Sequence, residues 1–184
     1  MYEEIIFSGF GGQGALFAGQ LLAYAALDAG KQVTWIPSYG PEMRGGTAHC
    51  TVVIADEEIG SPMSRHPGIA VALNLPSYQK YEPRVKPGGF LIYNSDLIDA
   101  PQVRTDIRYV PVPANVIAEG LGNVRMANVA LLGALLASAN LLAVEAVIRA
   151  LDAHLPPRQR KYLAANQEAL RQGAAHGVPA LAPA

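Results

Sequence analysis

The sequence predicts an α/β protein: a single Rossmann-like domain with a largely parallel sheet and a helical C-terminal region. Short apolar runs that suit strands alternate with helical patterns, glycine and proline separate them, and after Pro113 the pattern turns helical. We expect the domain to span residues 1–172, and a flexible tail rich in alanine and proline to follow over residues 173–184.

The first forty residues follow a strand, turn, helix, strand order. An apolar strand over 4–8 meets a glycine-rich turn over 9–14, a helix follows over 15–29, and a second strand covers 32–36. Gly30 stands where a left-handed cap is favoured after the helix. Because such a βαβ unit must cross over, this order predicts that its two strands form a parallel pair.

The remaining elements are separated by glycine and proline. Further strands are expected over 47–55, 69–74, 90–94 and 107–112. Helices are expected over 76–81, 114–121, 126–137 and 143–154, and a polar helix from Pro156 through Arg171.

The helix over 15–29 is apolar nearly all round. Its two adjacent i,i+4 rows are Phe17, Leu21, Ala25 and Ala18, Leu22, Ala26. A helix of this kind is covered on both sides. We therefore expect one side to pack on its own sheet and the other on a sister subunit, so that the isolated chain self-associates through exposed apolar surface.

Composition and charge exclude several classes of function. Fourteen Lys and Arg face fifteen Asp and Glu, for a net charge of −1, so neither nucleic-acid binding nor attachment to a membrane is expected. The uncharged stretch between Arg125 and Glu145 approaches the length of a membrane span, but Asn128 and Asn140 interrupt it, which favours two buried helices. An acidic start, where a signal peptide would be basic, predicts a cytoplasmic protein.

The glycine-rich turn is the first candidate site. Gly9, Gly11 and Gly14 match the G-x-G-x-x-G fingerprint between a strand and a helix, where backbone amides can approach a phosphate. The dinucleotide interpretation also requires a carboxylate at the end of the second strand, and none is present. An anion site on Gly9, Gly11, Gly12, Gln13 and Gly14 and a purely structural role in close packing both remain open.

The second candidate is the loop over 39–46, which presents Tyr39, Glu42, Met43 and Arg44. Arg44 could clamp a phosphate or carboxylate, or it could pair with Glu42 and hold the loop. Met43 suits an interface and a ligand contact equally well. We expect Arg44 to lie near the glycine-rich turn, because both would follow the carboxyl ends of adjacent parallel strands.

Other reactive residue types give weak signals. Cys50 is the single cysteine, which excludes an intrachain disulfide and a cysteine-ligated cluster, and its apolar strand predicts a small buried residue. The four histidines lack metal-ligand spacing, so no metal site is expected in this chain. Asn74, Asn115 and Asn128 suit capping roles, although Asn115 and Asn128 could line one cleft.

Together these motifs resemble the gamma subunit of 2-oxoacid:ferredoxin oxidoreductases. The resemblance rests on the glycine-rich turn at its distance from the Tyr-Gly-Pro-Glu-Met-Arg-Gly-Gly loop. Supporting segments are Ile59-Gly60-Ser61-Pro62, Asn74-Leu75-Pro76-Ser77-Tyr78, Lys86-Pro87-Gly88-Gly89 and the late Asn128.

This resemblance implies a non-catalytic subunit of an enzyme that oxidatively decarboxylates a 2-oxoacid to acyl-coenzyme A and passes electrons to ferredoxin. 2-Oxoglutarate and branched-chain 2-oxoacids are favoured over pyruvate. Thiamine diphosphate would lie between the alpha and beta subunits, which a delta subunit could join, and the iron–sulfur clusters would sit on cysteine-bearing chains. The complex would also use magnesium and coenzyme A, and no cofactor is expected on this chain alone. The chain would be structural, and its turn and the loop residues Tyr39, Glu42 and Arg44 could face coenzyme A or contact other subunits.

The alternative is a free-standing nucleotide-binding Rossmann-like protein or dehydrogenase, which would use the same turn. A monodisperse monomer that binds a nicotinamide cofactor would favour this alternative. Recovery with thiamine-binding and iron–sulfur subunits would favour the gamma-subunit hypothesis.

Overall fold

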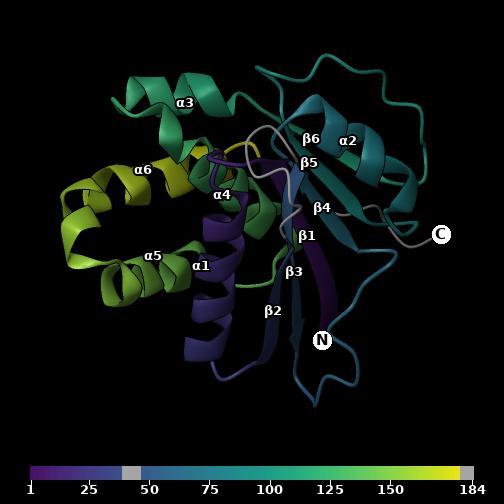
Figure 1. Ribbon diagram of the computed structural model, residues 1–184, viewed down its shortest axis with the longest axis horizontal. Coiled ribbons are helices and arrows are strands. Elements are labelled where there is room, and N and C mark those ends of the chain that lie inside the picture. The colour runs from purple at the N-terminus through teal and green to yellow at the C-terminus, as the bar shows by residue number, and fades with distance from the viewer. Residues whose placement is uncertain (39–46, 179–184) are drawn as a thin grey trace.

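A six-stranded mixed sheet organises the computed structural model, which describes residues 1–38 and 47–178 (Figure 1). The strands are β1 (Tyr2–Phe10), β2 (Gln32–Ser38), β3 (Thr47–Ala55), β4 (Ile69–Ala72), β5 (Phe90–Asn94) and β6 (Arg108–Val112). The helices are α1 (Ala15–Asp28), α2 (Leu75–Tyr81), α3 (Ala114–Gly120), α4 (Ala127–Ala139), α5 (Val144–His154) and α6 (Leu163–Ala174), with short 3-10 turns η1 (Glu82–Arg84), η2 (Val124–Met126) and η3 (Pro157–Tyr162). The predicted elements are therefore present, with ends shifted by a few residues.

The sheet order is β2-β3-β1-β4-β5-β6, and the pairs β1–β4, β4–β5 and β5–β6 are parallel. This confirms the α/β class and the largely parallel sheet. The expected parallel pairing of the first two strands is wrong, because β3 lies between β1 and β2 and is antiparallel to both. β2 and β3 follow one another in sequence and pair antiparallel, as consecutive strands commonly do, and the other edge of β3 pairs with β1.

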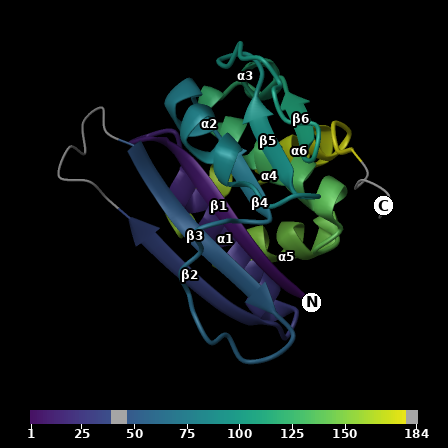
Figure 2. The same cartoon turned by 90° about the vertical axis from the view of Figure 1, so that its right-hand side faces the viewer.

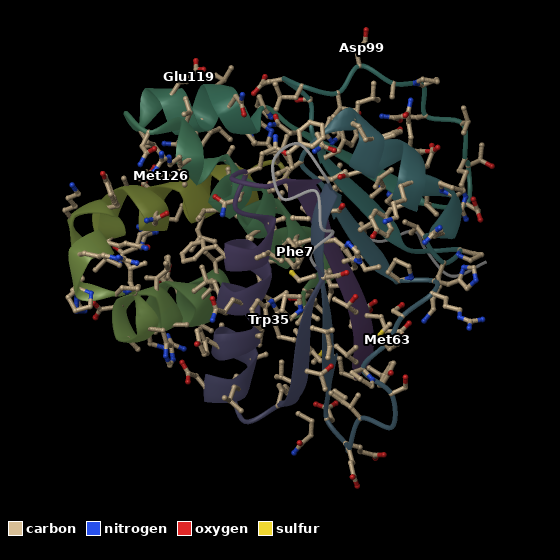
Figure 3. The ribbon with its side chains drawn as sticks, in the orientation of Figure 1. Phe7, Trp35, Met63, Asp99, Glu119 and Met126 are labelled. Carbon is tan, nitrogen blue, oxygen red and sulfur yellow. The ribbon has the colours of Figure 1, made fainter. Side chains whose placement is uncertain are left out.

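Most helices lie on one face of the sheet. α1 and α4 pack directly on the strands, and α5 and α6 pack over them. Phe7 and Trp35 lie on this side of the sheet, toward α1 (Figure 3). α2 covers the opposite face over β1 and β4, whereas no helix of the described residues lies over β2 and β3 on that face (Figure 2).

Helix α1 is covered on its second side by α5 and α4 of the same chain. Leu22, Ala25 and Ala26 are fully buried within the single chain. The expected cover from a sister subunit is thus supplied within the chain, and Leu27, 60% exposed, is the large apolar side chain of α1 that faces solvent. Apolar periodicity shows that a helix is covered but not which element covers it.

The long uncharged stretch forms α4, which crosses α6 at very close range. A Cβ on Gly133 would lie 2.1 Å from the carbonyl oxygen of Leu170, and a Cβ on Gly173 would lie 1.9 Å from that of Ala130. Among the described residues, no helix is long and apolar enough to cross a membrane.

The start of the expected tail is packed against α4. Gly173 is buried in α6, and the amide of Val178 donates a 3.0 Å hydrogen bond to the Ser138 hydroxyl. The domain boundary at residue 172 stays a prediction, and residues 179–184 lie outside the described part of the chain.

Candidate functional site

The neighbouring strands β1 and β4 send their helices to opposite faces of the sheet. α1 follows β1 on one face and α2 follows β4 on the other (Figure 1). In open α/β sheets, ligands bind in the crevice outside the carboxyl ends of two such strands. The glycine-rich turn, residues 9–14, lies at this position.

Gln13 ties the turn to the end of β4. Its Oε1 accepts hydrogen bonds from the Phe10 amide at 2.7 Å and from Asn74 Nδ2 at 3.0 Å, while its Nε2 donates to the Leu73 carbonyl at 3.3 Å. Asn74 also caps α2 by accepting from the Ser77 amide at 2.9 Å, which confirms its expected capping role. The side chain of Gln13 therefore makes three hydrogen bonds within the chain.

Two of the glycines are needed for close packing. A Cβ on Gly9 would lie 2.9 Å from both Gln13 Oε1 and Leu73 Cβ. Gly14 adopts a left-handed φ of +81°, and its Cβ would lie 2.4 Å from Asn128 Nδ2. Gly11 and Gly12 are exposed, and no atom lies within 4 Å of a Cβ built on Gly12. The structural role thus accounts for Gly9 and Gly14, while the exposed pair leaves the turn's backbone open to a ligand.

Asn128 links α4 to the turn. Its Nδ2 donates a 2.9 Å hydrogen bond to the Gly14 carbonyl, and the side chain is only 2% exposed. Its Oδ1 is buried and has no hydrogen-bond partner within the described residues. Leaving a buried acceptor unpaired costs roughly 1–3 kcal/mol, so this oxygen suits a ligand group or water that donates a hydrogen bond.

A cleft of about 560 Å³ opens beside the turn on the α1 side of the sheet. Its walls come from the turn and α1, from the connection between α3 and α4, and from η3 and α6. They comprise Gly12, Gly14, Phe17, Gly122, Asn123, Arg125, Met126, Asn128, Gln159, Tyr162 and Asn166. Met126 lies where α3 approaches α6 (Figure 3).

The cleft is equipped to hold an anion. The N-cap residue of α1, Gly14, has no side chain to cap the helix, so the first-turn amides and the positive end of the helix dipole remain available at this end of the cleft. Among the described lining residues, Arg125 alone carries a charge, and its side chain is exposed. The described part of its walls has no carboxylate, histidine or cysteine, and Tyr162 is the one titratable side chain there besides Arg125, so these walls offer mainly neutral hydrogen-bonding groups and one cation.

Sequence reasoning missed Arg125, Asn123 and Tyr162. They approach the turn only through the packing of α4 and α6, and no local motif marks them. The signal that could have found them is Asn128, which belongs to the family resemblance and lies in the first turn of α4, three residues after Arg125.

The predicted companion of Asn128 lies elsewhere. Asn115 accepts a 2.9 Å hydrogen bond from Asn94 at the end of β5 and does not line the cleft, so the shared-cleft prediction is wrong. The reason is that α3 starts at the end of β6, whose neighbour is β5.

Tyr39, Glu42 and Arg44 lie outside the described residues, so the proximity of Arg44 to the turn stays a prediction. That prediction assumed that β1 and β2 are adjacent parallel strands, and this assumption is wrong, since β3 separates them.

The single thiol is chemically quiet. Cys50 is fully buried, its Sγ lies 3.6 Å from the Ala15 carbonyl, and burial raises the pKa of the thiol to about 12. A buried thiol of this kind is an inert packing residue. Within the described residues, no group of three His, Cys, Asp or Glu side chains could hold a metal ion.

Comparison with known proteins decides the family. The family model described as pyruvate ferredoxin/flavodoxin oxidoreductase matches residues 4–176. The chain belongs to this family.

Its relatives include separate subunits and longer proteins. The 2-oxoglutarate synthase subunit KorC of Methanocaldococcus jannaschii is 37% identical over 159 residues, which are 85% of this chain and 85% of KorC. The ketoisovalerate oxidoreductase subunit VorA of Methanothermobacter marburgensis is 43% identical over 130 residues, or 71% of this chain. The chain spans 27% of VorA, so the same domain forms part of a longer polypeptide there.

Solved structures agree with this assignment. The gamma subunit of a keto/oxoacid ferredoxin oxidoreductase from Geobacter sulfurreducens matches with a TM-score of 0.80 and 31% identity, covering 95% of this chain and 97% of that one. A 2-oxoglutarate:ferredoxin oxidoreductase from Magnetococcus marinus shares the fold, with a TM-score of 0.85 at 23% identity over 95% of this chain and 31% of its own. The resemblance to gamma subunits is confirmed.

Proposed function

We propose that this chain is the gamma-type subunit of an enzyme that oxidatively decarboxylates a 2-oxoacid to acyl-coenzyme A and passes the electrons to ferredoxin. 2-Oxoglutarate and branched-chain 2-oxoacids are the favoured substrates, in keeping with the relatives named for 2-oxoglutarate and ketoisovalerate. The alternative of a free-standing dehydrogenase loses support, because β3 separates the glycine-rich turn from the end of β2, where a ribose-binding carboxylate would stand.

One observation carries the role within that enzyme: the described walls of the cleft at the glycine-rich turn combine open backbone amides with the single cation Arg125 and carry no carboxylate, histidine or cysteine. In this proposal the chain is a structural subunit that faces coenzyme A, and catalysis belongs to its partners. Alpha and beta subunits hold thiamine diphosphate, magnesium and the iron–sulfur clusters in this proposal, since the buried Cys50 is unsuited to ligating a cluster.

Within the cleft, a phosphate of coenzyme A would accept from the first-turn amides of α1 and pair with Arg125. Asn128 Oδ1 would accept a hydrogen bond from the same ligand. Arg44 is a second candidate to bind this phosphate. Thr47, the first residue of β3, pairs with Phe10 in the glycine-rich turn, so the chain directly after the 39–46 loop lies next to that turn.

The experiment is an Arg125→Ala substitution in the assembled complex, with Arg149→Ala as control. Arg149 is an exposed arginine of α5 and does not line the cleft. Loss of one charge-assisted contact should raise the KM for coenzyme A about tenfold and leave the KM for the 2-oxoacid unchanged. An active Arg125→Ala complex with an unchanged KM for coenzyme A would reject the coenzyme-facing role.

The assignment to a complex has its own test. An affinity-tagged chain recovered from its native cells should bring down thiamine-binding and iron–sulfur subunits, and the recovered material should reduce methyl viologen with a 2-oxoacid only when coenzyme A is present. The 2-oxoacid that supports reduction names the substrate. A chain that is recovered alone and binds a nicotinamide cofactor would support the dehydrogenase instead.

A further inference from the structure

Three basic side chains surround one buried tyrosine on the face of the sheet that α2 covers. Lys80 Nζ lies 5.0 Å and Arg84 Cζ 5.8 Å from the centre of the Tyr81 ring. The imidazole of His49, on β3, lies 6.1 Å from the same ring, which is itself only 3% exposed. Lys80 and Arg84 are exposed, and His49 is half-buried.

This cluster lacks an acidic counterpart among the described residues. No ion pair or side-chain hydrogen bond joins Lys80, Arg84 or His49 to a carboxylate there, and the nearby Glu82 instead accepts a hydrogen bond from Tyr109. His49 Nδ1 is buried without a hydrogen-bond partner. Burial, followed by the charges of Lys80 and Arg84, lowers the pKa of His49, and burial and Arg84 lower that of Lys80.

Cation–π attraction explains why one basic side chain lies beside a tyrosine ring, but not why three basic side chains gather at the same ring. Lys161 lies 4.9 Å from the Tyr162 ring with the same spacing in sequence, which shows that a lysine beside a tyrosine needs no further partner. At Tyr81, however, Lys80 and Arg84 share the same ring with His49, and the charges of Lys80 and Arg84 disfavour protonation of the imidazole. A bound anion would offset that effect.

The cluster lies at the ligand-binding edge of the sheet. His49 pairs in register with Ser8, the residue before Gly9, and Lys80 is near the end of the helix that starts beside Gln13. It occupies the α2 face, however, and none of its residues lines the cleft beside α1. The two positions are separate.

We propose that His49, Lys80 and Arg84 form a second anion site, which binds a phosphate group. Arg84 offers a planar fork of donors, Lys80 a compact charge, and His49 a donor that becomes cationic when the anion is bound. Three cationic groups match the two negative charges and several acceptor oxygens of a phosphate better than they match one carboxylate. The proposal does not depend on the proposed enzyme function.

Phosphate titration of the full chain, followed by NMR of the histidine ring protons, tests this site. Inorganic phosphate should shift the His49 resonances saturably and raise the pKa of His49, because a dianion favours the protonated imidazole. Lys80→Gln and Arg84→Gln should each weaken phosphate binding about tenfold, whereas Arg149→Ala, the loss of an isolated surface charge, should leave it unchanged. Glutamine keeps much of the side-chain length, and circular dichroism confirms that each variant folds.

Titrations with pyrophosphate and with ADP show whether the site recognises a phosphate group alone or a nucleotide that carries it. Equal affinities would identify the phosphate group alone as the ligand, and tighter binding of ADP would identify a nucleotide that carries it. Arg125→Ala, which alters only the cleft, should not change the His49 response. An unsaturable shift, or equal weakening by Arg149→Ala, would show that phosphate acts only by screening and would overturn the proposal.

Discussion

Gly14 shows how a single residue type is dictated at the centre of the site. Its positive φ and its contact with Asn128 both require the absence of a side chain. The glycine spacing in the sequence predicted the turn and its position before α1. Arg125 could not be predicted, because it reaches the turn through the packing of distant helices rather than through any local pattern.

Gly14→Ala should destabilise the protein by about 2–4 kcal/mol, the sum of left-handed backbone strain and displacement of Asn128. Gly12→Ala is the matched control, since Gly12 also has a positive φ of +97° but its Cβ would meet open space. That variant should lose only about 1 kcal/mol. Urea denaturation of both variants measures the difference, and equal losses would contradict the contact with Asn128.

Cys50 should make the protein less stable in alkali. Burial raises the pKa of its thiol to about 12 in the folded chain, whereas an unfolded thiol titrates near pH 8.5. The folded state therefore keeps a proton that the unfolded state loses, so this contribution is complete below about pH 8.5 and declines as the pH rises toward 12. The decline is at most about 1.4 kcal/mol per pH unit.

Cys50→Ala tests this contribution. The variant should show a flatter loss of unfolding free energy between about pH 8.5 and 10, before the tyrosines add their own effect. Burial also raises the pKa values of Tyr78, Tyr81 and Tyr109, so a decline above that range is expected in both proteins. Identical pH profiles for the two proteins would contradict the assignment to Cys50.

Arg44 remains a candidate on sequence grounds alone. In the assembled complex, Arg44→Ala should raise the KM for coenzyme A about tenfold if its guanidinium clamps a phosphate, while Arg44→Lys should recover part of the affinity. Should both variants keep the parent KM, the loop serves contacts other than coenzyme A.

The elements along the chain were largely predictable, whereas their pairing was not. Apolar runs and glycine or proline punctuation place each strand to within a few residues. β3 lies between β1 and β2, whereas the sequence predicted that β1 and β2 pair directly. Each of these two arrangements gives every strand a hydrogen-bonded neighbour, so local sequence patterns do not distinguish them. In the same way, the apolar pattern of α1 predicts that the helix is covered on both sides, but only the folded structure shows that α5 covers its second side.

Helix α3 depends on a cap supplied from the loop after β5. Asp96 Oδ2 accepts from the amides of Asn115 at 2.8 Å and Val116 at 3.0 Å. Asp96→Ala should cost about 1 kcal/mol of unfolding free energy, and Asp96→Asn should retain most of it because an amide oxygen also caps well. Thermal unfolding of the two variants compares them, and an unchanged midpoint for Asp96→Ala would show that the cap does not stabilise α3.

At the scale of the whole molecule, the fold gathers anion-binding groups at one edge of the sheet. The glycine-rich turn and Arg125 lie on the α1 side, and His49, Lys80 and Arg84 lie on the α2 side. The motif spacing in the sequence was sufficient to identify the family, but the second cluster combines β3 with α2 and η1, and only the folded sheet reveals it.

Covering of α1 within the chain also changes the expected behaviour of the isolated protein. Since α5 and α4 bury its apolar rows, aggregation through α1 is no longer expected at moderate concentration. Sedimentation of the isolated chain should give a monomer. Concentration-dependent association that a Leu27→Glu substitution abolishes would instead identify α1 as an interface.

The central claim is that this chain completes a 2-oxoacid:ferredoxin oxidoreductase without performing its chemistry. Reconstitution of the complex from its separate subunits, assayed by methyl viologen reduction with 2-oxoglutarate or a branched-chain 2-oxoacid, tests it most directly. We predict that coenzyme-A-dependent activity appears only when this chain is present, and that Arg125→Ala raises the KM for coenzyme A alone. Full activity of the remaining subunits in its absence would contradict the account.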